Sequence, residues 1–181
     1  EMIAFTAKFT SRSSLEISMP SITYISRKLF LCRHCSIKIA TNTAGLDAAV
    51  SLSIRKLEFS FNKNIIDANI FGTLSSEEFF NQSFSMRGNF EINYEDKTYH
   101  DYLKNENTKA MRIQFTSNEL IGVSSVPQFT LDLSKVSFEE WSVEKSADEL
   151  AIQTISFNAL YDSTNDNIVN SCQLINSTLS Y

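Results

Sequence analysis

The chain has 181 residues, of which 43% are hydrophobic and 12% aromatic, and this length and composition suit one packed domain over residues 1–181. Its 16 Lys and Arg against 21 Asp and Glu give a formal net charge of −5, which disfavours tight nucleic-acid binding because phosphates attract clustered cations. No apolar run approaches the ~18 residues that cross a bilayer, and the start at Glu1 lacks the pattern of a signal peptide. These features predict a soluble protein with no membrane partner, and the opening Glu-Met pair suggests that upstream residues are missing.

Apolar and polar residues alternate along most of the chain, and many of the apolar ones are Phe, Ile or Val. This period of two is typical of half-buried strands in an antiparallel sheet. The clearest strand covers 84–94, where Gly88 stands in the apolar row. The whole set predicts a mainly β fold, an antiparallel β-sandwich or β-barrel of about seven to nine strands. In chain order, the predicted strands cover residues 3–9, 29–39, 52–61, 84–94, 111–115, 129–138, 155–161 and 168–175.

Two of these strands change the phase of their alternation midway. The apolar face switches at Arg55-Lys56 in one strand and at Ser134-Lys135 in the other. A strand changes phase only with a bulge, or where it passes from one sheet or interface to another. We therefore expect these strands to cover apolar surface on two sides, as they would where a sheet is shared between a domain core and a partner subunit.

Two short segments carry the side-chain pattern of a helix start. Thr98 precedes Asp101 by three residues, and Ser75 precedes Glu78 by three, so each pair satisfies the logic of a capping box. Each could open one or two helical turns. The better-supported one, Tyr99 to about Lys104, is predicted as a short helix that flanks the sheet.

Side chains for catalysis are scarce. A nucleophile needs a base within hydrogen-bond reach, usually a histidine, and the chain has only His34 and His100. We interpret His100 as a surface histidine beside the first-turn carboxylate of Asp101. Neither a glycine-rich phosphate loop nor a G-x-S-x-G motif occurs. The sequence therefore predicts no enzyme activity and no cofactor.

The cluster Cys32-Arg33-His34-Cys35 is the motif that most resembles a metal site. Because it lies inside a strand pattern, the thiols of Cys32 and Cys35 would point to opposite faces and could not easily share one zinc ion. We predict no metal site, with Cys35 buried and Cys32 on the other face. The odd total of three cysteines, with Cys172 as the third, and the missing signal peptide indicate folding in a reducing interior.

The last third of the chain carries an ordered series of segments. Residues 129–138 (FTLDLSKVSF) are followed by an acidic loop, by 152–164 (IQTISFNALYDST), and by a closing strand that ends at Asn176. These segments resemble the end of the tail tube proteins, or major tail proteins, of long-tailed bacteriophages. Ser134 stands where that family often has a proline.

The middle of the chain agrees with the same family. Residues 40–49 (ATNTAGLDAA) and 53–64 (SIRKLEFSFNKN) resemble the family's loop and following strand, and 84–96 resembles its glycine-containing strand with an acidic end. The resemblance covers roughly residues 28–180. Cys32 and Cys35 depart from it, because these positions usually hold other residues.

The resemblance implies a β-sandwich or β-barrel with a short flanking helix, whose copies form a ring, usually of six. The inner strands of such a ring unite into one barrel, and rings stack into the tube through which the genome travels. The implied partners are other copies of the chain and other tail proteins, in a virion tail made in the cytoplasm of a host bacterium. An acidic subunit fits this role, since negative charge along the bore repels phosphate and lets DNA slide without binding.

Functional residues of a self-assembling subunit lie at its interfaces. We predict contacts between subunits at both phase changes, and a contact with the adjacent ring at the acidic loop that follows the second. Two alternatives stay open, the inner tube of a contractile injection system and a β-sandwich module that binds a ligand such as carbohydrate. The predicted interface residues are Arg55, Lys56, Leu57, Phe59, Lys135, Val136, Phe138, Glu139, Glu140 and Trp141.

Overall fold

The structure is a computed structural model that describes residues 30–68, 78–121, 123–145 and 150–176. The predicted strand over 3–9 lies outside the described residues, and no described helix is long and apolar enough to cross a membrane. The elements, in chain order, are the 3₁₀ turn η1 (Cys32–His34), β1 (Cys35–Ala40), the 3₁₀ turn η2 (Thr43–Gly45), β2 (Ser51–Leu52), β3 (Ile54–Asn62), β4 (Ile65–Ala68), β5 (Glu78–Asn81), β6 (Ser85–Asn93), α1 (Thr98–Lys104), β7 (Lys109–Thr116), β8 (Gln128–Glu144), β9 (Ile152–Ala159) and β10 (Val169–Ile175).

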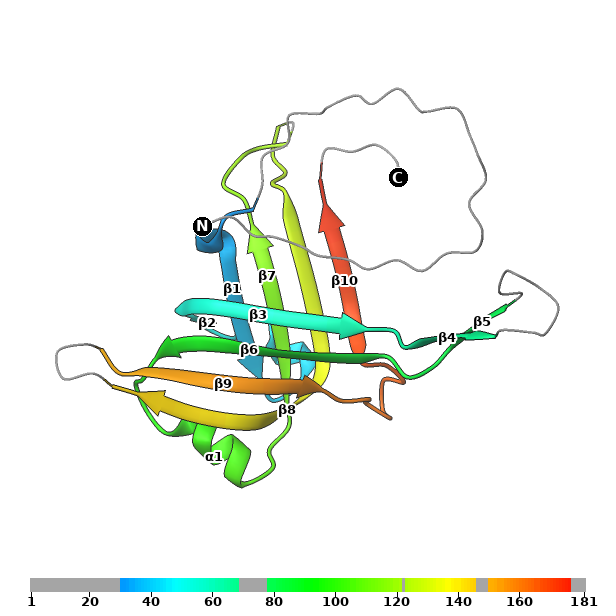
Figure 1. The fold of residues 1–181 in the computed structure, drawn as a ribbon. Coiled ribbons are helices and arrows are strands. Elements are labelled where there is room, and N and C mark those ends of the chain that lie inside the picture. The colour runs from blue at the N-terminus through cyan, green and yellow to red at the C-terminus, as the bar shows by residue number, and fades with distance from the viewer. Residues whose placement is uncertain (1–29, 69–77, 122, 146–149, 177–181) are drawn as a thin grey trace.

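Eight strands form one antiparallel sheet in the order β2-β1-β7-β8-β9-β6-β3, with β10 paired to β8. Only Ser53 separates β2 from β3, so the two ends of this order are almost one stretch of chain and the sheet closes on itself. Two crossed layers result, in which β1, β7, β10 and the first half of β8 run across β3, β6 and β9 (Figure 1). The predicted mainly β, antiparallel fold with a short flanking helix is confirmed.

Strand β8 belongs to both layers because it bends at two bulges. Its first half pairs with β7 and β10, and its second half pairs with β9. Its pairing with β7 shifts register around Ser134-Lys135, and its pairing with β9 shifts at Glu139. Each shift leaves one extra residue on β8, which bends the strand and increases its twist. The predicted phase change at Ser134-Lys135 is therefore confirmed as a bulge.

A third bulge lies in β3, where the pairing with β6 shifts between Ile54 and Lys56. It confirms the phase change at Arg55-Lys56. The expectation of apolar surface on two sides is wrong for the second phase change, because Leu133 and Val136, on either side of it, are both fully buried in the same core. When a strand bends, the extra residue of a bulge turns the next side chain back toward the core. The change of phase therefore keeps the side chains on both sides of the bend in one continuous core.

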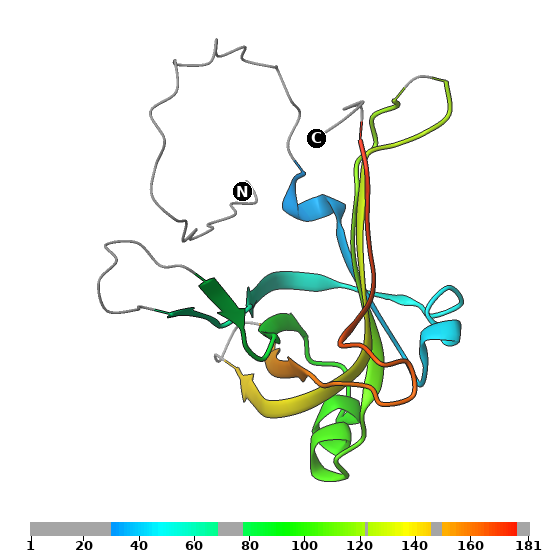
Figure 2. The same cartoon turned by 90° about the vertical axis from the view of Figure 1, so that its right-hand side faces the viewer.

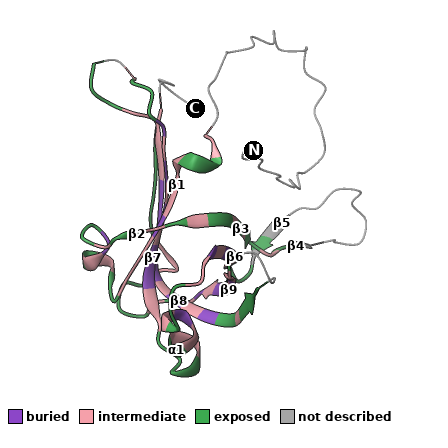
Figure 3. Ribbon diagram, turned by 90° about the vertical axis from the view of Figure 1, so that its left-hand side faces the viewer, coloured by how far each residue is buried: buried purple, intermediate pink, exposed green. Residues whose placement is uncertain are grey.

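The core lies where the two layers cross. Its fully buried strand residues come from β1, β6, β7, β8 and β9, and they include two Phe rings, Phe90 and Phe157, with centroids 6.2 Å apart. Buried residues concentrate along β7 and along the crossing strands (Figure 3). Gly88 on β6 lies against Phe157, and this close approach explains why a glycine occupies an apolar row.

Two local predictions need correction. Residues Cys32–His34 form a 3₁₀ turn instead of the first part of a strand, and the strand begins only at Cys35. Glu78 is the first residue of strand β5 instead of a first-turn helix residue, while Ser75 lies outside the described residues. The predicted helix is confirmed as Thr98–Lys104, although Asp96, and not Asp101, accepts the backbone N–H of Thr98, at 2.9 Å.

Helix α1 is held to the body by aromatic rings. Tyr99 lies edge-on to Phe90, Tyr102 and Phe138, at centroid distances of 5.9, 6.0 and 6.2 Å. Burial of its phenol raises the pKa of Tyr99 to about 12, because the charged phenolate would be desolvated.

This raised pKa predicts a loss of stability at high pH. Below pH 10 the phenol is protonated in both the folded and the unfolded chain, so its contribution is fully present. Between the unfolded pKa of 10 and the folded value of about 12, only the unfolded chain loses the proton, and the free energy of unfolding falls by about 1.4 kcal/mol per pH unit. Urea unfolding at pH 9 and pH 11 should show this extra loss in the parent chain and not in Tyr99→Phe. Equal losses in both proteins would contradict it.

Candidate functional site

The described residues hold little that could do chemistry. Among them, no group of three or more His, Cys, Asp or Glu side chains comes together to hold a metal ion. His100 is a surface residue with its Nδ1 3.3 Å from Asp101, as predicted. The Cys35 thiol is partly buried, and this burial raises its pKa to about 12, so it stays protonated at neutral pH.

The residues of the first phase change lie on the outside of the second layer or at its edge. Arg55 donates to the Asn93 side chain at 3.3 Å, and the Lys56 ammonium lies 3.0 Å from Glu58 and 3.7 Å from Glu91. Hydrogen bonding to Glu58 raises the pKa of Lys56. These contacts are solvent-exposed and therefore weak. Leu57 and Phe59 are partly buried and pack against the protomer's own core.

The residues of the second phase change are used mostly inside the protomer. Val136 is 0% exposed and Phe138 is 6% exposed, so neither has surface left for a neighbouring subunit, which corrects their expected role at an interface. Lys135 is half-buried, and its backbone carbonyl accepts the N–H of Leu160 at 2.8 Å.

The segment Glu139-Glu140-Trp141, predicted to lie in a loop, is part of strand β8. Glu139 and Glu140 are exposed on the outside of the second layer, where Glu140 accepts from Ser156 at 3.4 Å. Trp141 points inward: its indole N–H donates to Gln153 at 3.1 Å, and its ring lies 4.9 Å from that of His100. The structure therefore separates this aromatic side chain from the two carboxylates.

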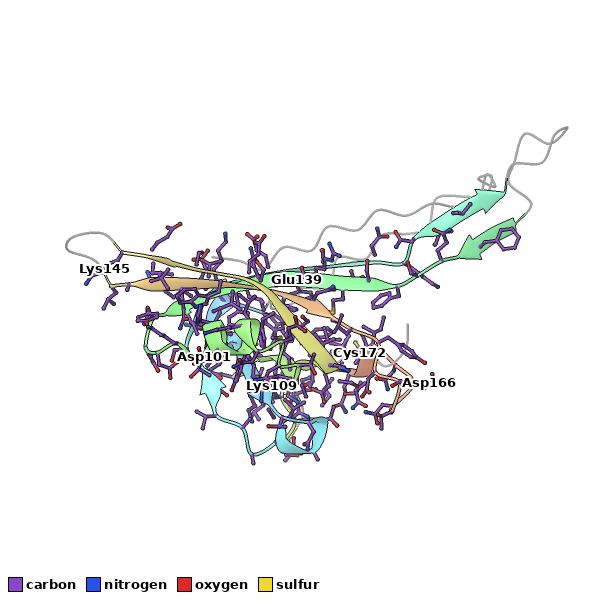
Figure 4. All side chains as sticks on the ribbon, turned by 90° about the horizontal axis from the view of Figure 1, so that it is seen from below. Asp101, Lys109, Glu139, Lys145, Asp166 and Cys172 are labelled. Carbon is purple, nitrogen blue, oxygen red and sulfur yellow. The ribbon has the colours of Figure 1, made fainter. Side chains whose placement is uncertain are left out.

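A different surface, which the sequence analysis missed, carries exposed apolar side chains. Strands β4 and β5 form a two-stranded ribbon, and together with 61–64 and 82–84 we call this ribbon the arm. The arm projects well beyond the two layers (Figures 1 and 4). Its exposed apolar side chains, each between 36% and 66% exposed, are Phe61, Ile65, Ile66, Phe80 and Phe84. The signal in the sequence is two apolar doublets, 65–66 and 79–80, on either side of a segment with a glycine.

The direction of the arm is fixed by Asn64, which joins β3 to β4. Asn64 has a φ of 45°, in the left-handed region that Asn tolerates better than most residues. Its N–H donates to the Asn62 side chain at 3.0 Å, and its amide donates to the Ser83 carbonyl at 2.9 Å. The Asn64 carbonyl accepts the N–H of Gln82 at 2.8 Å. These bonds tie the two sides of the ribbon together where it leaves the body.

Strand β10 lies on the same side of the molecule as the arm (Figure 1). It pairs with β8 along one edge, and no described strand pairs with its other edge. Leu174 on β10 is 51% exposed. Exposed apolar side chains and an unpaired strand edge are liabilities for an isolated subunit, and together they are typical of an assembly surface.

The outer face of the first layer carries a clamp of charges. Arg112 on β7 binds Asp132 on β8 through two bonds, from Nε at 2.6 Å and from Nη2 at 2.9 Å, and it also binds Asp47 after η2. Ser171 on β10 donates to Asp132 at 3.1 Å. The guanidinium lowers the pKa of the Asp47 carboxyl by hydrogen bonding and charge, and the two carboxylates raise the pKa of Arg112. The clamp ties β7, β8, β10 and the η2 segment into one unit.

Removal of the guanidinium should destabilise the fold. In Arg112→Met the buried carboxylate of Asp132 loses its only cationic partner among these contacts, and breaking a buried pair in this way costs about 3 kcal/mol. Arg55→Met is the matched control, because Arg55 is exposed, and we expect a change within about 0.5 kcal/mol. Chemical denaturation of both variants measures the difference, and equal stabilities would contradict it.

Comparison with known proteins shows the fold. No protein-family model and no curated protein matches this sequence. The structure is similar to a chain of the terminating cap of the anti-feeding prophage tube, with a TM-score of 0.57, 8% identity, and coverage of 85% of this chain and 97% of that chain. It is also similar to a chain of the sheath-tube complex of an extracellular contractile injection system, PVC (TM-score 0.55, 10% identity, 83% and 95% coverage). A third similar chain comes from the tail of an empty gene transfer agent particle with C6 symmetry (TM-score 0.52, 10% identity, 81% and 98% coverage).

Proposed function

We propose that this protein is a structural subunit of the tail tube of a phage-like particle, that it performs no chemistry and that it needs no cofactor. Copies join into a ring, rings stack into a conduit for the genome, and the tube sits in a virion tail with other tail proteins. The fold supports this proposal, because the similar chains come from tube and tail assemblies. The C6 symmetry of one such tail supports a ring of six.

The observation that carries the proposal is the exposed apolar surface on one flank. The arm and the β10 edge lie on the same side and present six large apolar side chains to solvent. A monomer gains nothing from keeping this surface in water, whereas a neighbouring copy would bury it at about 25 cal/mol for each Å².

Strand directions support a ring that joins the β10 flank of one copy to the β1 flank of the next. Successive strands β1, β7, β8 and β10 alternate in direction, so β10 and β1 are antiparallel to each other. Strand β2 pairs with the other edge of β1 only at Ile37 and Lys38. A second copy placed with the start of its β1, around Cys35 and Ser36, beside β10 therefore continues the alternation. Such a head-to-tail contact uses two different surfaces and closes into a ring when the rotation between copies allows.

The interface residues predicted from the sequence then fall into two groups. Leu57, Phe59 and Trp141 mainly support the protomer's own core and act on assembly only through the position of β3 and β8. The exposed side chains, and the half-buried one of Lys135, stay candidates for contacts with other rings or other tail proteins. These candidates are Arg55, Lys56, Lys135, Glu139 and Glu140.

A carbohydrate-binding module has less support. Such modules present a planar row of exposed aromatic rings to the sugar. Here the single Trp, Trp141, is partly buried and lies between His100 and Tyr94, with centroids at 4.9 and 6.5 Å.

The direct test is the mass of the purified chain as a function of concentration. Light scattering and mass photometry should show a discrete species of about six subunit masses, and electron micrographs should show rings or tubes with a central hole. A strict monomer at every concentration, with the fold intact by circular dichroism, would overturn the proposal.

A further inference from the structure

The outer face of the first layer, formed by β1, β7, β8 and β10, faces away from the core. Register places its side chains in rows across the four strands. One row is made only of hydroxyls and amides, and its members are Ser36, Gln114, Thr130 and Gln173. The next row, Lys38, Arg112, Asp132 and Ser171, holds the charges.

The charges of this face cancel. Lys38 and Arg112 are matched by Asp132 and by Asp47, which lies over the row, so the formal charge of the set is zero, against −5 for the whole chain. Each charge is also tied to a partner on the same face: Arg112 binds both carboxylates, and the Lys38 ammonium donates to the Asp47 carbonyl at 3.3 Å.

The outside of the second layer is different. Around β3, β6, β9 and the second half of β8, carboxylates outnumber the cations. This surface borders a shallow depression, and its charged side chains include Lys56, Glu58, Arg87, Glu91, Glu139 and Glu140. The excess negative charge of the chain is thus partly gathered here, on the opposite side of the molecule from the clamp.

We propose that the face of β1, β7, β8 and β10 lines the bore of the tube and forms an electroneutral wall of hydroxyl and amide groups. This inference rests on the proposed function. If β10 joins β1 of the next copy, the first layer becomes the continuous wall of the ring. The lower part of its core face is covered by β3, β6 and β9 (Figure 2). These strands and the projecting arm take up more space than the first layer alone, so in a ring they must lie at the larger radius, on the outside. The outer face of the first layer then lines the bore.

An electroneutral wall changes how cargo passes. A wall of fixed carboxylates would hold a polyanion away from the surface, and a wall of cations would bind it. A wall whose charges are paired does neither, and its hydroxyl and amide groups exchange short-lived hydrogen bonds with water and cargo alike. The earlier expectation that negative charge lines the bore is replaced by this one.

The test places a single cysteine on the outer face of the first layer and measures how fast charged thiol reagents modify it, because these rates depend on the local electrostatic potential. In a chain with Cys32, Cys35 and Cys172 replaced by Ser, Gln114→Cys or Gln173→Cys supplies the reporter, and Ser142→Cys on the outside of β8 is the matched control. Assembled material is separated from free chain by sedimentation. The assembled material is then treated with a maleimide that is attached to a bulky polymer. In parallel, it is treated with two small methanethiosulfonate reagents, one cationic and one anionic, that are similar to each other in size.

The inference expects the bulky reagent to label Ser142→Cys in assemblies and in free chain, and to label Gln114→Cys only in free chain. It also expects the ratio of cationic to anionic rates at Gln114→Cys in assemblies to stay within about twofold of the ratio for a small free thiol. A negative bore would raise that ratio about tenfold or more. Adding Thr116→Glu on the same face should raise it, which shows that the assay responds.

The three results that would contradict the inference lead to different conclusions. Full labelling of Gln114→Cys and Gln173→Cys by the bulky reagent in assemblies would overturn the bore assignment and leave the tube proposal intact. Protected thiols with a strongly shifted ratio would overturn electroneutrality alone. A chain that never assembles would overturn both the proposed function and this inference.

Discussion

If the chain forms the proposed ring, Ile66→Glu/Phe80→Glu should leave a folded monomer that no longer assembles. Ile66 and Phe80 are direct cross-strand partners on the arm, so they lie on the same face of the ribbon. Each is about half exposed in the isolated chain, and surface substitutions of this kind change the free energy of unfolding by about 0.5 kcal/mol or less.

The effect on assembly is expected to be far larger. Burial of an Ile or Phe side chain contributes about 1.5–3 kcal/mol, and a carboxylate buried without a partner adds a further cost. The double substitution therefore removes at least about 3 kcal/mol from each contact, which raises the concentration needed for association by about a hundredfold or more. Mass photometry of the variant and the parent at equal concentration measures this shift.

The matched control is Leu120→Glu/Val123→Glu in the loop between β7 and β8. It also exchanges two exposed apolar residues for glutamate, but at the end of the first layer, away from the arm. Its rings should form as in the parent chain. If both double variants assemble normally, the arm is not the surface that holds the ring together.

The sequence predicted the strands well because half-buried strands leave a plain pattern. Buried residues alternate strictly along β9, for example, where every second side chain enters the core. The same pattern marked two of the three bulges, those at Arg55-Lys56 and Ser134-Lys135, since a bulge changes the phase, but not the one at Glu139. The alternation cannot show in which direction the strand continues after a bulge. The change of phase at Ser134-Lys135 predicts a second interface, whereas the bend returns Val136 to the first core.

The arm and the η1 turn were missed for a related reason. Side chains on a ribbon in solvent follow no rule of inside and outside, so Ile65 and Ile66 stand side by side without alternation. At Cys32, the apolar residues at 29 and 31 extended the apparent strand, and the 3₁₀ turn became visible only from the backbone bond of His34 to the Leu31 carbonyl, at 2.9 Å. The charge clamp of Arg112 could not be predicted, because Asp132 meets it through the sheet register and Asp47 through the path of the segment after η2.

Gly88→Ala should destabilise the fold by about 3 kcal/mol, the largest effect that we expect from a single added methyl group. An alanine Cβ at this position would lie 2.5 Å from the Glu58 carbonyl oxygen and 2.7 Å from the Phe157 ring. The first is backbone of the paired strand β3, and the second is a fully buried ring packed on Phe90, so neither can move aside freely. Urea unfolding measures the loss.

Gly45→Ala is the control, because its Cβ would meet only side-chain atoms, the Cβ of Ala40 at 3.2 Å and the Oδ1 of Asn42 at 3.6 Å, and we expect a loss within about 1 kcal/mol. Adding Phe157→Leu to Gly88→Ala should not recover the parent stability, since the clash with the β3 carbonyl remains.

Because β3 continues through Asn64 into the arm, a displaced β3 also moves the assembly surface. Gly88→Ala should therefore raise the concentration needed for ring formation even where the chain is still folded. If Gly88→Ala has the same free energy of unfolding as the parent chain and assembles at the same concentration, then β3 and Phe157 can move aside without loss of stability, which would contradict this prediction.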